Sequence, residues 1–199
     1  MDTPYQTDMV INDEGCLAYI MRNWLAKEIA DELFEILKTD LPWVRYPTTV
    51  YGKTHPTPRL MCAFSDTGLE EHNYTSSSIP FQPWPISILE IKERLIREFN
   101  VHVDSALGNY YCLESDYIAF HSDREAMGLL HPVFGLTLGG TRDFDFRHKK
   151  DLSRKERRQL HSGDLLVMLG RTQELWTHGI PKRAHPPPRI SLTFRQLQE

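Results

Sequence analysis

Short hydrophobic segments follow one another closely in the second half of the chain, and in two of them hydrophobic and polar residues alternate with a period of two. In residues 189–195 the alternation is complete, with the sequence Arg-Ile-Ser-Leu-Thr-Phe-Arg. The alternation is also strict at 143–147, and short segments rich in apolar and aromatic residues lie at 109–112, 117–120, 133–138, 165–168 and 175–180, with turn residues such as Gly139-Gly140 between segments. This period is typical of half-buried strands. Seven or eight such strands at close spacing predict a double-stranded β-helix, or jelly roll.

The first half of the chain is more mixed. Apolar residues recur with helical spacing at 24–38 and 87–99, with Asn23 as a candidate N-cap and Ser87 and Glu90 as a candidate capping box. Residues 8–22 predict a hairpin around 12–15, and the proline-rich residues 44–85 predict strands and long loops. The expected fold class is therefore mainly β with flanking helices. At 199 residues, a single domain over 1–199 is the default.

The composition places limits on the class of protein. No run of about 18 apolar residues occurs, and residues 1–5 resemble no secretory signal. The number of cysteines is odd, and the three lie far apart in the sequence, at Cys16, Cys62 and Cys112. This pattern favours free thiols in a reducing compartment. We therefore expect a protein that is not secreted: cytoplasmic if bacterial, nuclear or cytoplasmic if eukaryotic.

The charge is distributed unevenly. The formal net charge is −4, and residues 1–40 hold nine acidic and three basic residues. Residues 142–158 hold eight Lys or Arg against four acidic residues. Such a basic segment is able to contact phosphates, although charge alone favours a solvated loop or helix.

His121, Asp123 and a distant His178 form a candidate metal site. In a strand, residues i and i+2 point the same way, so the first two side chains can reach one ion. Two imidazoles and one carboxylate form the facial triad of non-haem Fe(II) oxygenases, which leaves coordination positions open. The chain has nine His, so a His-x-Asp motif can easily occur by chance. Zn binds the same types of ligand, so a Zn hydrolase stays open as an alternative interpretation.

Arg189 and Arg195 share one face of the last strand, about 20 Å apart at roughly 3.3 Å per residue. Their long side chains can lean together and bind a dicarboxylate at both ends. Taken alone, however, this pattern is more typical of a solvent-facing strand with two surface arginines.

These motifs together resemble the AlkB family of Fe(II)- and 2-oxoglutarate-dependent nucleic-acid dealkylases. The resemblance rests on Asn109-x-Tyr111, His121-x-Asp123, His178 and residues 189–195, in that order. It is clear over 105–199, and looser as far back as Val50-Tyr51-Gly52. It implies a catalytic core over 105–199, with 1–104 as an N-terminal scaffold and nucleotide-recognition lid.

The resemblance also implies roles for individual residues. His121, Asp123 and His178 are expected to bind Fe(II), and the cosubstrate 2-oxoglutarate is expected to bind Asn109, Tyr111, Arg189 and Arg195. The candidates for contacting the nucleic acid are Tyr51, Arg59, Phe64, Tyr74 and Glu125.

The implied reaction uses O2 and 2-oxoglutarate to demethylate bases such as 1-methyladenine and 3-methylcytosine, which is direct reversal of alkylation damage. The expected partner is alkylated DNA, with RNA as a further candidate, and the protein is expected to be a monomer without a membrane partner. Two alternatives stay open besides the Zn hydrolase: an Fe(II)/2-oxoglutarate oxygenase acting on a protein or small molecule, and a non-catalytic nucleic-acid-binding β-barrel.

Overall fold

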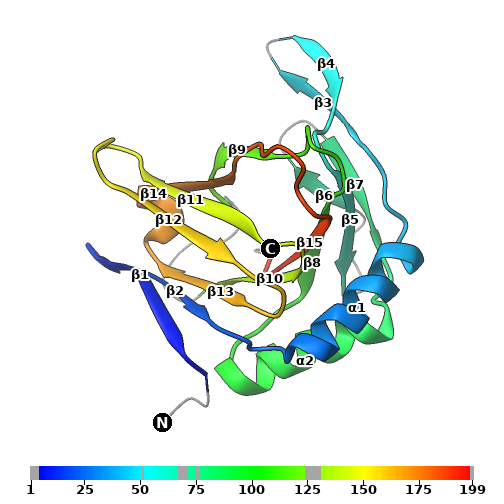
Figure 1. Ribbon diagram of the computed structural model, residues 1–199, viewed down its shortest axis with the longest axis horizontal. Helices are drawn as coiled ribbons and strands as arrows, with labels where there is room; N and C mark the ends of the chain where they lie inside the picture. Colours follow the sequence, from blue (N-terminus) through cyan, green and yellow to red (C-terminus); the bar gives the residue numbers. More distant parts are fainter. Residues whose placement is uncertain (1–4, 51, 67–70, 75–76, 124–130, 198–199) are drawn as a thin grey trace.

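The computed structural model describes residues 5–50, 52–66, 71–74, 77–123 and 131–197. Within these residues two sheets face each other, and a separate hairpin projects from one end (Figure 1). The larger sheet has nine strands, in the order β1 (Thr7–Asp13), β2 (Cys16–Met21), β13 (Leu165–Gly170), β10 (Val133–Gly139), β15 (Arg189–Arg195), β8 (Ser105–Tyr111), β5 (Leu60–Ser65), β7 (Ser77–Gln82) and β6 (Glu71–Tyr74).

The smaller sheet has the order β12 (Lys155–Leu160), β11 (Arg142–His148), β14 (Trp176–Ile180) and β9 (Ile118–His121). The projecting hairpin pairs β3 (Pro47–Val50) with β4 (Lys53–Pro56). Among the described residues, all strand pairs are antiparallel except β5 with β7. These two facing sheets confirm the predicted jelly-roll core.

Two long helices cover the outer face of the large sheet (Figure 1). They are α1 (Lys27–Asp40) and α2 (Ile86–Phe99); a single turn, α3 (Thr172–Leu175), precedes β14. The predicted helices therefore exist, but both predicted caps are wrong. The N-cap positions are Ala26 and Pro85, and neither makes a side-chain capping hydrogen bond.

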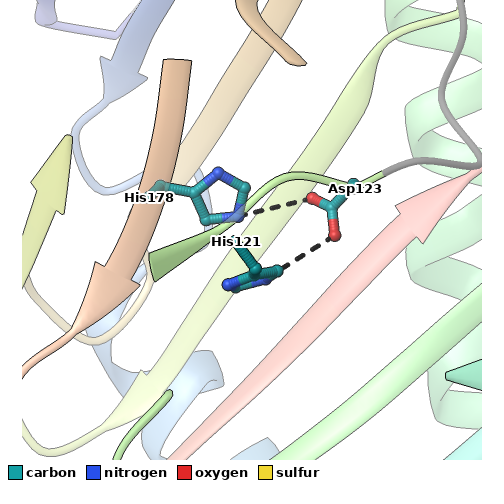
Figure 2. Close-up of side chains that lie close together, drawn as sticks. All are labelled: His121, Asp123 and His178. Carbon is teal, nitrogen blue, oxygen red and sulfur yellow. Dashed lines mark ion pairs between the residues drawn. The ribbon is translucent and has the colours of Figure 1, made fainter. Parts of the chain in front are cut away.

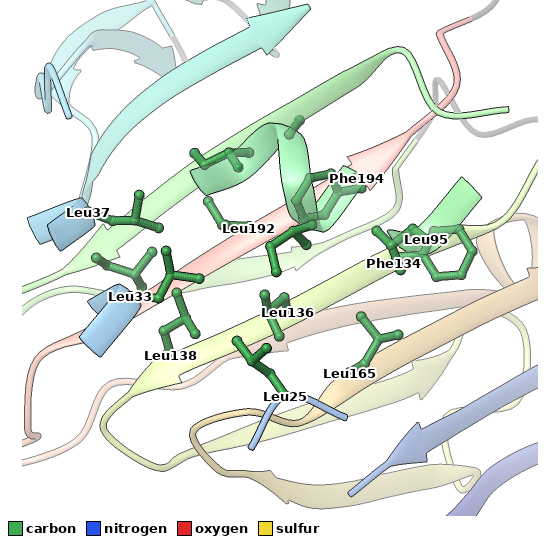
Figure 3. Packing of buried hydrophobic residues seen from close by; sticks show 14 of the residues in the cluster. Leu25, Leu33, Leu37, Leu95, Phe134, Leu136, Leu138, Leu165, Leu192 and Phe194 are labelled. Atoms are coloured by element: carbon green, nitrogen blue, oxygen red, sulfur yellow. The ribbon is translucent and has the colours of Figure 1, made fainter. Parts of the chain in front are cut away.

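The alternation of β15 decides what lies on each side of the large sheet. Ile190, Leu192 and Phe194 are fully buried against the two helices, in a core that β10 and β13 complete (Figure 3). The intervening residues of β15 face the space between the sheets. Burial of this apolar face against the helices fixes the register of β15, because a slip of one residue would exchange the two faces.

Strand β12 was not predicted. Its sequence, Lys-Glu-Arg-Arg-Gln-Leu, is almost entirely polar, yet it pairs with β11 along its whole length. It is the edge of the small sheet, where charged side chains are common because they discourage pairing with other chains.

The two halves of the sequence share the large sheet. Strands β1, β2 and β5 to β7 come from residues before 105, and β8, β10, β13 and β15 come from later residues. We propose on this ground that 1–199 is one domain. No helix in the described part of the chain is both long enough and apolar enough to cross a membrane.

The turn before β13 generates a prediction about stability. Gly163 has φ +88°, and a Cβ there would lie 2.2 Å from the carbonyl oxygen of Leu25. We expect Gly163→Ala to lower the free energy of unfolding by about 3 kcal/mol or more, from backbone strain plus this clash. Chemical denaturation measures the change.

Gly52 is the matched control. It has a similar φ of +74°, but nothing lies within 4 Å of an added Cβ. Gly52→Ala is therefore expected to cost only about 1 kcal/mol of strain. Equal losses at the two positions would contradict the role given to the contact with Leu25.

Candidate active site

Three potential metal ligands converge between the sheets. His121 ends β9, and it lies directly opposite His178 of β14 in the antiparallel register. Asp123 follows two residues after His121, and one ligand atom from each of the three residues lies within 4.8 Å of the others (Figure 2). His178 Nε2 is 3.5 Å from Asp123 Oδ2, and His121 Nε2 is 3.9 Å from Asp123 Oδ1. This arrangement suits one divalent ion bound by two nitrogens and a carboxylate.

Both imidazoles are prepared to act as ligands. Burial, helped by the neighbouring His121, lowers the pKa of His178 to about 3 even though Asp123 opposes the shift. His178 is therefore neutral near pH 7, which is the form a metal requires. His121 Nδ1 lies 2.9 Å from the carbonyl oxygen of Ala119. A carbonyl can only accept, so Nδ1 carries the proton and Nε2 keeps its lone pair for a metal.

Gln173, which was not predicted as a site residue, holds the third ligand in place. Its Oε1 accepts a hydrogen bond of 3.0 Å from the backbone N–H of Asp123, and its Nε2 donates to Met168 Sδ at 3.4 Å. Gln173 lies 50 residues from Asp123 in a one-turn helix. Only the pairing of β14 with β9 brings the two together, so no local motif identifies it.

Arg189 and Arg195 line the same pocket as the three ligands, together with Asn109 and Tyr111. Their exposed fractions are 1% and 2%, so the interpretation as surface arginines is wrong. The reason is that the polar face of β15 is covered by the small sheet rather than by water. Arg195 Nη1 lies 3.5 Å from Asp123 Oδ1, which connects the arginine pair to the metal ligands.

Arg189 has unused hydrogen-bonding capacity. Its Nη2 donates to Thr137 Oγ1 at 2.8 Å and to Ser191 Oγ at 3.4 Å. Within the described residues its buried Nε and Nη1 make no hydrogen bond of good geometry, although the Tyr111 side chain lies near enough to raise the pKa of Arg189. Burial lowers the pKa of Arg189 to about 10, against a raising influence of Tyr111, so it is still a cation at neutral pH. A buried cation with unpartnered donors is costly by itself and fits an anionic group such as a carboxylate, which accepts charge-assisted N–H bonds.

The structure separates the five candidate nucleic-acid contacts. Arg59 is buried and bonds to Asn109 rather than facing solvent. Phe64 lies in the helix-side core, with its ring 6.1 Å from that of Trp84, so the prediction that it stacks on a base is wrong. Its position in β5 turns it toward α2. Tyr51 and Glu125 lie outside the described residues, and only the backbone of Tyr74, in β6, is described.

The basic segment 142–158 is neither a loop nor a helix, because most of it forms β11 and β12. Much of its charge is already paired. Arg154 bonds to Asp13 and Glu14, Arg157 to Asp145, and Arg158 to Glu156. Arg142 is buried. Local ion pairs thus reduce the charge that this segment offers to phosphates.

Comparison with known proteins gives a consistent result. A family model described as the 2OG-Fe(II) oxygenase superfamily matches residues 17–195. The cattle protein named "DNA oxidative demethylase ALKBH2" is 35% identical over 185 residues, which cover 86% of this chain and 66% of that protein. The mouse protein named "Alpha-ketoglutarate-dependent dioxygenase alkB homolog 3" is 34% identical over 181 residues, covering 84% and 62%. The chain thus spans slightly less than two thirds of the length of these relatives.

Two further matches extend this result. The human protein named "DNA oxidative demethylase ALKBH2" is 31% identical over 185 residues, covering 86% of this chain and 70% of that protein. The solved structure entitled "The structure of OsALKBH1" superposes with a TM-score of 0.62 at 19% identity, covering 94% of this chain and 100% of that one. The latter match shows a shared fold.

The buried charge of Arg189 leads us to predict that its removal stabilises the protein, whereas most substitutions of buried residues destabilise it. Arg189→Met removes a buried charge with unpartnered donors, so we expect the ligand-free protein to gain about 1–3 kcal/mol in free energy of unfolding. Arg142→Met is the contrast. Arg142 Nη2 donates to the backbone oxygens of Asp116 and Pro181, and its loss leaves both unsatisfied. That variant is expected to lose about 1–3 kcal/mol. Destabilisation by Arg189→Met in urea unfolding would contradict this account of the pocket.

Gln173 gives a second prediction for this site. Gln173→Ala removes the acceptor that orients the Asp123 backbone, and we expect affinity for Mn(II) or Fe(II) to fall about 10- to 100-fold. Gln159→Ala, at an exposed glutamine of β12, is the control and should leave affinity unchanged. Calorimetric titration of the metal measures both. Unchanged affinity in Gln173→Ala would refute a positioning role.

Proposed function

The chain belongs to the 2OG-Fe(II) oxygenase superfamily and, within it, to the AlkB family, and we propose that it is a dioxygenase that oxidatively demethylates N-alkylated bases in DNA. The single observation that carries the proposal is the pocket itself. It brings the three potential metal ligands together with two buried arginines, one of which keeps two unpartnered donors. A protein that only bound nucleic acid would have no use for these costly buried cations.

Each side chain has a distinct task in this proposal. His121, Asp123 and His178 hold Fe(II), with His178 neutral because it is buried. Arg189 supplies a charged N–H donor to one carboxylate of 2-oxoglutarate. Arg195, Asn109 and Tyr111 line the same pocket and complete the polar surroundings of the cosubstrate.

When bound, iron with 2-oxoglutarate and O2 supplies the oxidising power, which converts the N-methyl group to N-hydroxymethyl as 2-oxoglutarate becomes succinate and CO2. The hydroxymethylated base then releases formaldehyde and regains its N–H or lone pair. The contribution of the protein is to hold the reacting groups at the distance and orientation that the reaction needs, and to exclude water. The apolar wall of the pocket, which includes Phe144 stacked 5.3 Å from His178, serves the second purpose.

DNA as the substrate is supported by the relatives named as DNA oxidative demethylases. A base inside a duplex cannot reach a pocket between two sheets, so it must be flipped or already single-stranded. Lesions such as 1-methyladenine and 3-methylcytosine cannot pair normally, which lowers the cost of flipping. We propose that Tyr51, which falls between β3 and β4 in the sequence, contacts the duplex, with Tyr74 and Glu125 near the flipped base.

We also propose that the protein acts as a monomer. The three potential metal ligands and both buried arginines belong to the same chain, so this set of groups is complete without a second copy.

The direct test is turnover of an oligonucleotide that contains 1-methyladenine. We expect demethylation, formaldehyde and succinate in equal amounts, only when Fe(II) and 2-oxoglutarate are both present. His121→Ala is expected to reduce the rate by at least about 100-fold, because a metal ligand is lost. His102→Ala, at an exposed histidine outside the pocket, is the matched control. DNA and RNA versions in single- and double-stranded form then rank the substrates.

Other outcomes distinguish the alternatives. Consumption of 2-oxoglutarate that no alkylated oligonucleotide stimulates would mean an oxygenase with a protein or small-molecule substrate. Activity that depends on Zn and needs no 2-oxoglutarate would mean a hydrolase. Tight oligonucleotide binding without any turnover would mean a binding module.

A further inference from the structure

Arg59 is a buried cation that belongs neither to the metal ligands nor to the wall of the pocket. Its exposed fraction is 3%, and it is not among the residues that line the pocket. A side chain this buried cannot reach a phosphate or a base without a rearrangement of the fold. Its position therefore disagrees with the expectation that it contacts nucleic acid, and calls for another role.

Arg59 lies directly behind Asn109. Strands β5 and β8 pair so that Met61 is opposite Asn109 and Leu60 is opposite Tyr110. Arg59 precedes Met61 by two residues, so its side chain falls on the same face of the sheet as Asn109. It is the neighbour of Asn109 along the strand direction. The Arg59 Nε–H donates to Asn109 Oδ1 at 2.6 Å, and both side chains are buried.

This hydrogen bond determines which way the amide of Asn109 points. An arginine side chain has only donors, so only the carbonyl oxygen of the amide can face it. The amide NH2 is attached to the same planar carbon and must point away from Arg59. Asn109 itself lines the pocket, opposite Ser191 of β15 and beside Arg189 and Tyr111. The side of Asn109 that faces the pocket is thus a donor.

We propose that Arg59 is a positioning residue, which fixes the amide of Asn109 with its NH2 toward the cosubstrate and so sets the affinity for 2-oxoglutarate. The inference rests on the proposed function, in which Asn109 contacts that dicarboxylate. A free asparagine can turn either its donor or its acceptor toward an anion, and the acceptor repels it. Arg59 removes the unfavourable orientation before the anion arrives.

The backbone around Arg59 is itself held firmly. Its carbonyl oxygen accepts from Thr57 Oγ1 at 3.0 Å, and the carbonyl oxygen of Thr57 accepts from Arg45 Nη1 at 2.9 Å. Arg45 in turn forms two hydrogen bonds to the fully buried Asp116, which lies between β8 and β9. The rigid backbone around Arg59 therefore allows its side chain to hold Asn109 in one orientation, as a positioning role requires.

The experiment measures 2-oxoglutarate binding to the full chain loaded with Mn(II), by calorimetry and without nucleic acid. Arg59→Met keeps much of the volume and removes the donor, and it should raise Kd about tenfold, the value of one buried hydrogen bond. Arg59→Lys keeps a residue that can only donate, and it should stay within about twofold of the unsubstituted chain. Arg59→Gln can present either a donor or an acceptor and should fall between them.

A double-mutant cycle tests whether Arg59 acts through Asn109. Asn109→Ala weakens 2-oxoglutarate binding by itself, and Arg59→Met should cause no further loss in that background. A simple structural defect would persist there. Lys92→Met is the matched control, because Lys92 is another buried cation but bonds to Asp66 and lies against Trp84, on the helix side. It should leave Kd unchanged whatever it does to stability.

The results separate the two proposals. If the unsubstituted chain does not bind 2-oxoglutarate, the proposed function fails. If it binds and Arg59→Met binds equally well, or if the two substitutions are additive, the positioning role alone is overturned. Should Arg59→Met fail to fold, the comparison of Arg59→Lys with Arg59→Gln decides, and equal Kd values for these two would overturn the proposal.

Discussion

Burial of positive charge on β15 is the constraint on which the rest of this structure depends. Arg189 and Arg195 are enclosed between two sheets, and burial opposes the charge of Arg189 strongly enough to lower its pKa to about 10. A fold keeps such a cation only if other contacts outweigh the cost. The opposite face of β15, with Ile190, Leu192 and Phe194 packed against α1 and α2, is the main compensation. The helices thus stabilise the strand whose other face is prepared for an anion.

The residues around the pocket form two layers. The inner layer holds the atoms that face a metal or a cosubstrate, and the outer layer fixes how those atoms point. The carbonyl of Ala119 sets the tautomer of His121, and Gln173 holds the backbone of Asp123. Arg59, in the positioning role we propose for it, has the same relation to Asn109. The outer layer comes from distant parts of the sequence, so the β pairings between them are what assemble the site.

The sequence was sufficient to predict the parts of the fold and site that depend on strict local periodicity. His121-x-Asp123 and the alternating 189–195 imply shared faces wherever the strands lie, and the structure brings those faces together. Predictions failed where the answer depended on the neighbouring strand. Nothing local shows that the Arg face of β15 is covered, that charged β12 pairs at an edge, or that Phe64 turns toward α2. Gln173 and Arg59 act across 50 residues each, beyond any motif.

The central claim is that the metal ligands and the buried arginines form one site that binds Fe(II) and 2-oxoglutarate together. The most direct measurement is calorimetric titration of 2-oxoglutarate into the chain under anaerobic conditions, with and without Fe(II). If the account is right, tight binding requires the metal and disappears in Arg189→Met, although that variant stays folded. Binding of equal strength without the metal, or retained in Arg189→Met, would show that the two sets of residues do not act as one site.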